Sequence, residues 1–94
     1  MSWKHFWLNG EHINSGDNHN SYCVDSYGAL TGLGRRYENV WLKYEEIIGI
    51  LNLKNKEEKY SLCDKLFNEK FPQLEKDIIE LSKEEQSKLE KLFP

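Results

Sequence analysis

Imidazole and thiol side chains gather in the first quarter of the chain. The residues are His5, His12, His19 and Cys23. Imidazole and thiolate groups are common zinc ligands in proteins. Among them only His19 and Cys23, with three residues between them, have the short spacing of a structural zinc site. We expect the histidines at the surface and the thiol half-buried, and we predict no metal site and no cofactor.

Cys23 with His12 or His19 could also form a nucleophile and its base. That chemistry requires a lowered thiol pKa and a nearby oxyanion donor, and none of the local sequence motifs of cysteine enzymes is present. Burial explains Cys23 and Cys63 more simply, because cysteine is among the most buried residue types. We therefore predict a protein that is not an enzyme, with both cysteines as free thiols.

A glycine-rich stretch, residues 28–36, ends in Arg35 and Arg36 and leads into the strongest helical pattern of the chain. A helix N-terminus with two arginines could hold a phosphate or carboxylate. The spacing matches neither a Walker loop nor a dinucleotide fingerprint. A linker with solvated arginines is the simpler interpretation, and contact with an anion or nucleic acid is the alternative.

Tryptophan, tyrosine and arginine are the residue types most enriched at interface hot spots, and they are dense in the first 41 residues. Tyr37 and Trp41 have positions on a helix face that assign them to the core. Trp3 and Trp7 do not, because alternation along a hairpin places them opposite its apolar face. The predicted interaction surface consists of Trp3, His5, Trp7, His12, Arg35 and Arg36.

The N-terminal third predicts β-structure. Asn9 and Gly10 predict a type I′ hairpin turn between residues 3–8 and 11–14. This register puts Ile13 on the inner face and His12 on the outer face. Residues 14–20 are polar and predict a loop, and residues 21–24 predict a short strand with Tyr22 and Val24 on one face and Cys23 on the other. Asp25 or Ser26 is expected to cap a helical turn over residues 27–30.

The remaining chain predicts helices. Apolar residues recur every three or four positions over residues 37–51, and a second helix is expected over residues 56–70. Pro72 is suited to begin a third helix, over residues 72–81, with Leu74, Ile78 and Leu81 inward. Ser82 and Glu85 form a capping box that predicts a last helix.

These elements predict an α+β fold: an N-terminal β-hairpin or small antiparallel sheet followed by a three- to four-helix C-terminal region. With 94 residues we expect one domain, residues 1–94. The net charge of −3 is too small to steer the chain toward nucleic acid. No apolar run approaches a membrane span or a signal peptide, so we expect a cytoplasmic protein that contacts no membrane.

The missing catalytic motifs and the aromatic surface together predict a non-enzymatic protein-binding module, a small inhibitor or adaptor of phage or mobile-element type. Its protein partner is not identified by the sequence, and a homodimer is a further expectation. The first alternative is a nucleic-acid-associated module that uses Arg35, Arg36 and the aromatic side chains. The second alternative is a small metal-binding domain.

Overall fold

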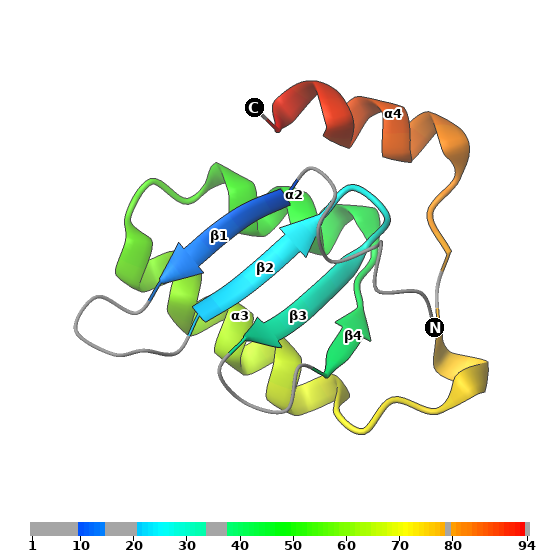
Figure 1. Cartoon of the computed structure of the whole chain (residues 1–94), viewed down its shortest axis with the longest axis horizontal. Helices are drawn as coiled ribbons and strands as arrows, with labels where there is room; N and C mark the ends of the chain where they lie inside the picture. The colour runs from blue at the N-terminus through cyan, green and yellow to red at the C-terminus, as the bar shows by residue number, and fades with distance from the viewer. Residues whose placement is uncertain (1–9, 15–20, 34–37, 79, 94) are drawn as a thin grey trace.

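The computed structural model describes residues 10–14, 21–33, 38–78 and 80–93. In this part the chain begins with a sheet and continues with helices (Figure 1). The strands are β1 (Gly10–Asn14), β2 (Ser21–Asp25), β3 (Ala29–Leu33) and β4 (Asn39–Trp41). The helices are α2 (Tyr44–Asn52), α3 (Lys56–Lys70), a 3₁₀ turn η1 (Glu75–Asp77) and α4 (Lys83–Leu92). The predicted α+β fold is confirmed.

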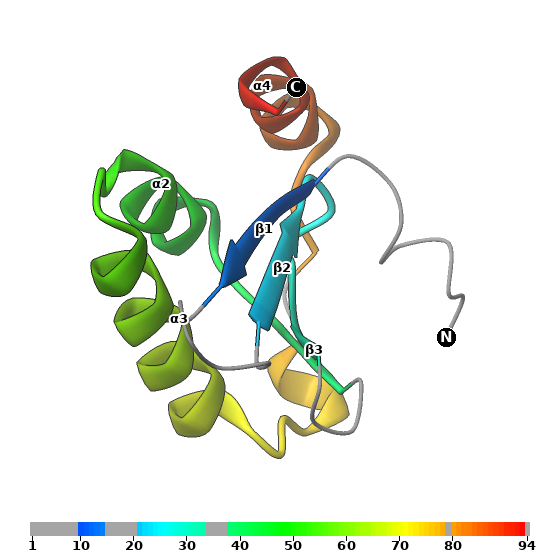
Figure 2. The ribbon, with the colours of Figure 1, turned by 60° about the vertical axis from the view of Figure 1, so that its left-hand side comes forward.

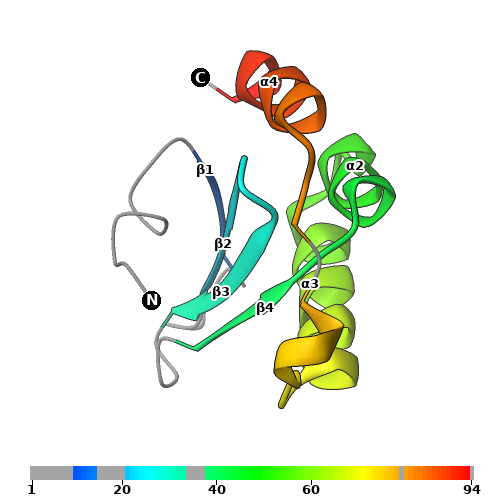
Figure 3. The same ribbon diagram turned by 90° about the vertical axis from the view of Figure 1, so that its right-hand side faces the viewer.

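The described strands pair in chain order as an antiparallel sheet, β1-β2-β3-β4. Val24 lies opposite Glu11 on β1 and Leu30 on β3, and Leu30 lies opposite Val40 on β4. Opposed residues share a face of an antiparallel sheet. Val24, Leu30 and Val40 on this face are fully buried, and α2 and α3 cover the face (Figures 2 and 3).

Helix α3 packs its apolar face against the middle of the sheet. The Tyr22 ring contacts the rings of Tyr60 and Phe67, at centroid distances of 5.3 and 5.7 Å. The Phe67 ring also lies against β3, since a Cβ atom at position 32 would be in van der Waals contact with it at 3.4 Å. The buried core consists of Ile13, Tyr22, Val24, Leu30, Val40, Leu42, Ile47, Ile50, Cys63, Leu66, Phe67, Leu81, Leu89 and Phe93.

The helix predicted over residues 37–51 is wrong in its first half. Residues 39–41 form β4, and α2 begins at Tyr44. Val40 and Leu42 are both fully buried, and a spacing of two places both on the inner face of a strand. Helix α2 begins after Lys43, whose backbone N–H donates to Glu46 Oε1 at 2.8 Å. The apolar residues of this segment fit the spacing of a strand as well as that of a helix, and pairing with β3 makes the segment a strand.

The helical turn predicted over residues 27–30 is also wrong, because β3 begins at Ala29. Asp25 does act as a cap, but of a tight turn between β2 and β3. Its Oδ1 accepts from the backbone N–H groups of Tyr27 and Ala29 at 2.9 and 3.1 Å. Gly28 adopts φ of +101°, which glycine adopts at little cost. The glycine-rich stretch is therefore partly a strand rather than a linker.

The helix predicted over residues 72–81 is reduced to the single turn η1. Leu81 is buried as expected, whereas Leu74 and Ile78 are 57% and 40% exposed. Gln73 explains part of the difference, because its side-chain amide binds the backbone of Trp41 on β4. This contact holds the segment after α3 against the sheet edge.

Three other predictions are confirmed. The strand over residues 21–24 is β2, with Tyr22 and Val24 facing the helices. Helix α3 has the predicted bounds of residues 56–70. The capping box before α4 forms, because Glu85 N–H donates to Ser82 Oγ and Ser82 N–H donates to Glu85 Oε1, both at 3.1 Å.

Of the predicted hairpin turn, Asn9 lies outside the described residues, and Gly10 is the first residue of β1, where it lies opposite Asp25 on β2. Residues 15–20 of the predicted loop also lie outside the described residues. No described helix has the length and apolar character needed to cross a membrane.

Candidate functional site

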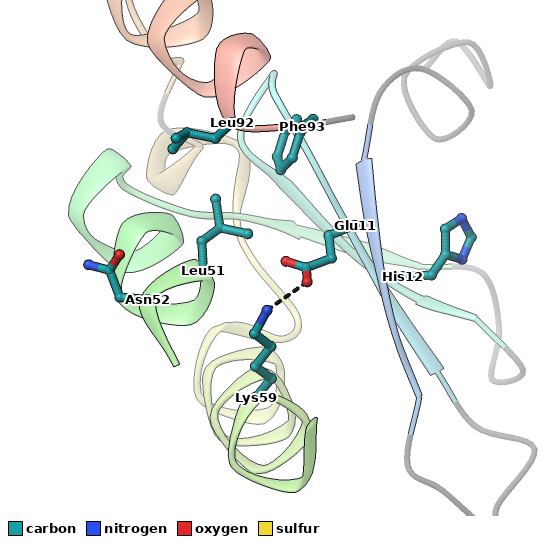
Figure 4. Close-up of a pocket in the computed structure, with 7 residues that line it drawn as sticks. All are labelled: Glu11, His12, Leu51, Asn52, Lys59, Leu92 and Phe93. Carbon is teal, nitrogen blue, oxygen red and sulfur yellow. Dashed lines mark hydrogen bonds and ion pairs between the residues drawn. The ribbon is translucent and has the colours of Figure 1, made fainter. Parts of the chain in front are cut away.

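A cavity of about 400 Å³ opens beside β1, where this strand meets the ends of three helices (Figure 4). Leu51, Leu92 and Phe93 give it apolar walls, and Glu11 and Lys59 give it a charged side. His12 and Asn52 complete the lining. In Figure 4 the His12 side chain points away from Glu11 and Lys59, to the other side of β1.

The charged side of the cavity is an ion pair between the sheet and α3. Lys59 Nζ lies 2.6 Å from Glu11 Oε1, and the two side chains are 14% and 33% exposed, respectively. Glu11 lies opposite Val24, so its side chain is on the inner face of the sheet, where the neighbouring residues are apolar. An ionised carboxylate in such a place requires a partner, and Lys59 supplies it from the start of α3.

Local sequence fixes the place of Lys59. Asn55 caps α3, because its Oδ1 accepts from the N–H groups of Glu57 and Glu58 at 2.7 and 3.2 Å. With the helix start set there, Lys59 follows one turn later and lies on the same side as Cys63, four residues further on. Cys63 is fully buried against the sheet, so Lys59 is directed toward β1.

A second region lies at the opposite margin of the sheet, along β4. The backbone groups of Glu38 and Leu42 point toward β3, because Gly32 N–H donates to Glu38 O and Leu42 N–H donates to the carbonyl of Gly28, the residue before β3. Backbone groups alternate in direction along a strand, so those of Trp41 point away from β3. Trp41 N–H donates to Gln73 Oε1 at 2.7 Å, and Gln73 Nε2 donates to Trp41 O at 3.2 Å.

Large apolar side chains are exposed in the segment that carries Gln73. Phe71, Leu74 and Ile78 are 37%, 57% and 40% exposed. The Phe71 ring stacks on Phe67 at a centroid distance of 5.6 Å, so it extends the core outward. We call these three residues the connector surface. Figure 3 shows η1 beside the last turns of α3, below β4.

Neither cysteine has the environment of a nucleophile. Burial, and secondarily the charge of Asp25, raise the pKa of Cys23 to about 11. Burial is also the main reason that the pKa of Cys63 rises to about 12. Cys23 does lie opposite His12 in the sheet register, but a thiol with a raised pKa stays protonated and unreactive at neutral pH.

Metal ligands are not clustered in the part of the chain that the structure describes. No group of three or more His, Cys, Asp or Glu side chains could hold an ion there. Cys23 and Cys63 are both free thiols, in agreement with the sequence.

Of the predicted interaction surface, one residue can be located. His12 is exposed and borders the cavity. Trp3, His5, Trp7, Arg35 and Arg36 lie outside the described residues. The predicted surface stays a prediction.

The sequence did not point to Glu11, Lys59 or Gln73. One signal for the ion pair was available. Glu11 is two residues before Ile13, which was predicted to face inward, and alternation along a strand puts both residues on one face. Gln73 gave no such signal, because its role depends on β4, which was predicted as helix.

Comparisons of the chain with protein-family models, curated proteins and solved structures gave no match.

Proposed function

We propose that this protein is a non-enzymatic protein-binding module of the small inhibitor or adaptor kind, and that the connector surface is part of its binding site. The carrying observation is that Phe71, Leu74 and Ile78 expose large apolar side chains within eight residues. Exposed apolar groups that gather in one segment often mark a protein-binding surface. The raised pKa values of both cysteines support a role without covalent chemistry.

The margin beside this surface suits a polypeptide partner. An exposed strand edge can accept a further strand, whose main chain supplies hydrogen bonds and whose side chains supply specificity. At Trp41 the Gln73 amide makes the two backbone hydrogen bonds that a neighbouring strand would make. A partner strand that replaced Gln73 would add to β4 and bring its side chains close to the connector surface.

The aromatic N-terminal surface remains part of the proposal. Trp3, His5, Trp7, Arg35 and Arg36 would extend the contact area from the exposed His12, as the sequence predicts. The nucleic-acid alternative depends on Arg35 and Arg36 and has no support from the described residues.

Cross-linking in cells that produce the chain tests the proposal. A photoreactive amino acid at position 74 should capture a polypeptide, and the same amino acid at position 92 serves as the control, because Leu92 is equally exposed at 58%. Leu74→Ser combined with Ile78→Ser should weaken retention of the captured protein by at least tenfold, as expected for hot-spot residues. Leu92→Ser should leave retention unchanged.

Two outcomes would overturn the proposal. The first is equal capture at positions 74 and 92, which would show that position 74 has no specific partner. The second is a cross-linked species that nuclease digestion removes, which would favour the nucleic-acid alternative. Capture of a second copy of the chain would show that the partner is the same protein, in a homodimer.

A further inference from the structure

Glu11 keeps an unused acceptor beside the cavity. Its Oε1 binds Lys59, and no hydrogen bond to its Oε2 is formed in the described part of the chain. A carboxylate has about four acceptor positions, and the Glu11 side chain is 33% exposed. In Figure 4 the carboxylate lies between Lys59 and the apolar side chains of Leu51 and Phe93. A ligand in the cavity can therefore reach it.

Two of the three helix ends beside the cavity are C-termini. Leu51 and Asn52 belong to the last turn of α2, and Leu92 and Phe93 lie at the end of α4. Unpaired carbonyl groups give each helix C-terminus a partial negative charge of about half a unit. The last turn of α2 contains no basic residue, whereas that of α4 contains Lys91. Among the lining residues, Lys59 is the one ammonium group, and Glu11 already neutralises it.

We propose that this cavity binds a small amphipathic amine, a molecule with one ammonium group on a hydrocarbon body. The ammonium group donates to Glu11 Oε2, and the hydrocarbon body lies against Leu51, Leu92 and Phe93. A volume of about 400 Å³ is in the range of small-molecule sites. An anion would instead meet the Glu11 carboxylate and the C-terminus of α2, whose last turn contains no basic residue. This site does not depend on the protein-binding proposal.

Three probes of one shape test the charge requirement. They are 2-phenylethylamine, 2-phenylethanol and 3-phenylpropanoate, each titrated into the ¹⁵N-labelled full chain at pH 7. The amine should give saturable shifts at the amides of Glu11, Leu51, Lys59 and Phe93. The alcohol should bind about tenfold more weakly, since a hydrogen bond to a charged group contributes on the order of 1.5–3 kcal/mol. The acid should give no saturable shift.

Variants show whether Glu11 is the recognised group. Glu11→Gln should abolish the tenfold preference for the amine, and Glu69→Gln, the same change at an exposed position of α3, should retain it. Lys59→Met removes the competing internal ammonium group and should raise amine affinity severalfold. This second variant decides the question if Glu11→Gln fails to fold.

The proposal is overturned if the acid binds as tightly as the amine. It is also overturned if the chemical-shift changes caused by the amine rise linearly, without saturation, up to concentrations about 10-fold above those that saturate the protein with the alcohol. An unchanged preference in Glu11→Gln, or unchanged amine affinity in Lys59→Met, would also overturn it.

Discussion

The two margins of the described sheet meet the rest of the chain in opposite ways. At β1 a charged pair joins strand to helix, and a cavity remains beside it. At β4 a neutral amide binds the strand directly, and apolar side chains project outward. A charged pair needs partial contact with water to limit its desolvation cost, whereas an amide matches the backbone in polarity and can lie flat on a strand edge.

Helix α3 connects the two margins. Its first turns place Lys59 beside β1, and its last residue, Lys70, forms an ion pair with Glu46 of α2 at 3.1 Å. Phe71, directly after the helix, begins the segment that reaches β4. One helix therefore positions both regions. Substitutions at its two ends measure how much the contacts at each end contribute to the free energy of unfolding.

Gln73→Ala should have the largest effect on stability at either margin. It removes two hydrogen bonds to Trp41 and a third, from Gln73 Nε2 to Asp77 O at 3.3 Å. Each hydrogen bond contributes about 0.5–1.5 kcal/mol net, so we expect a loss of about 2–3 kcal/mol in the free energy of unfolding. Urea denaturation followed by tryptophan fluorescence and circular dichroism measures it.

Gln86→Ala is the matched control, because Gln86 makes one side-chain bond, to Leu81 O at 3.1 Å. It should cost about 1 kcal/mol. The Gln73→Ala variant should also self-associate as its concentration is raised, since the substitution uncovers a strand edge. Gel filtration with light scattering would show this as an increase in molar mass. Equal stability of the two variants would mean that the bonds from Gln73 to Trp41 do not stabilise the β4 edge of the sheet.

Lys59→Met should have the next largest effect. It leaves Glu11 on the inner face of the sheet without its cation, but Glu11 is a third exposed, so water relieves part of the cost. We expect a loss of about 1–2 kcal/mol at pH 7 in urea denaturation. Glu11→Gln combined with Lys59→Met should recover part of this loss, because no charge is left unpaired. A double variant less stable than Lys59→Met would contradict this account.

The elements that the sequence predicted best have their determinants close together in the chain. Asn55 and Ser82 cap the starts of helices α3 and α4, and each side chain binds a backbone N–H three residues further along the chain. The region of β4 failed because Val40 and Leu42 suit a strand and a helix equally, and pairing with distant β3 decides between them. Local capping can be seen in sequence, and competition between two tertiary arrangements cannot.

The same limit applies to the candidate sites. Glu11 and Lys59 are 48 residues apart and Trp41 and Gln73 are 32 apart, so neither contact has a local pattern. Prediction relied on residue types instead, and favoured tryptophan, arginine and histidine. Alternation with Ile13 is a local signal for the inward position of Glu11 that was not used, and its partner depended on the packing of α3.

Lys70→Met should have a smaller effect than Lys59→Met. Lys70 and Glu46 are 19% and 26% exposed, and Glu46 keeps a second role through its bond to Lys43 N–H. The carboxylate is therefore not left without a partner, and we expect a loss of about 0.5–1 kcal/mol. If Lys70→Met cost as much as Lys59→Met, the second bond of Glu46 would not protect it, and the ion pairs at the two ends of α3 would contribute equally to stability.

Lys88→Ala should have the smallest effect. Lys88 Nζ lies 3.7 Å from Glu84 Oε1 on α4, and the two side chains are 57% and 82% exposed. Pairs of this kind, four residues apart on a helix surface, contribute about 0.3–0.5 kcal/mol and are screened by salt. Alanine also has a high helix propensity, which offsets part of the loss. We therefore expect a change within about 0.5 kcal/mol that vanishes in 1 M salt. A larger loss would show that α4 depends on its surface charges as well as on Leu89 and Phe93, its buried contacts with the core.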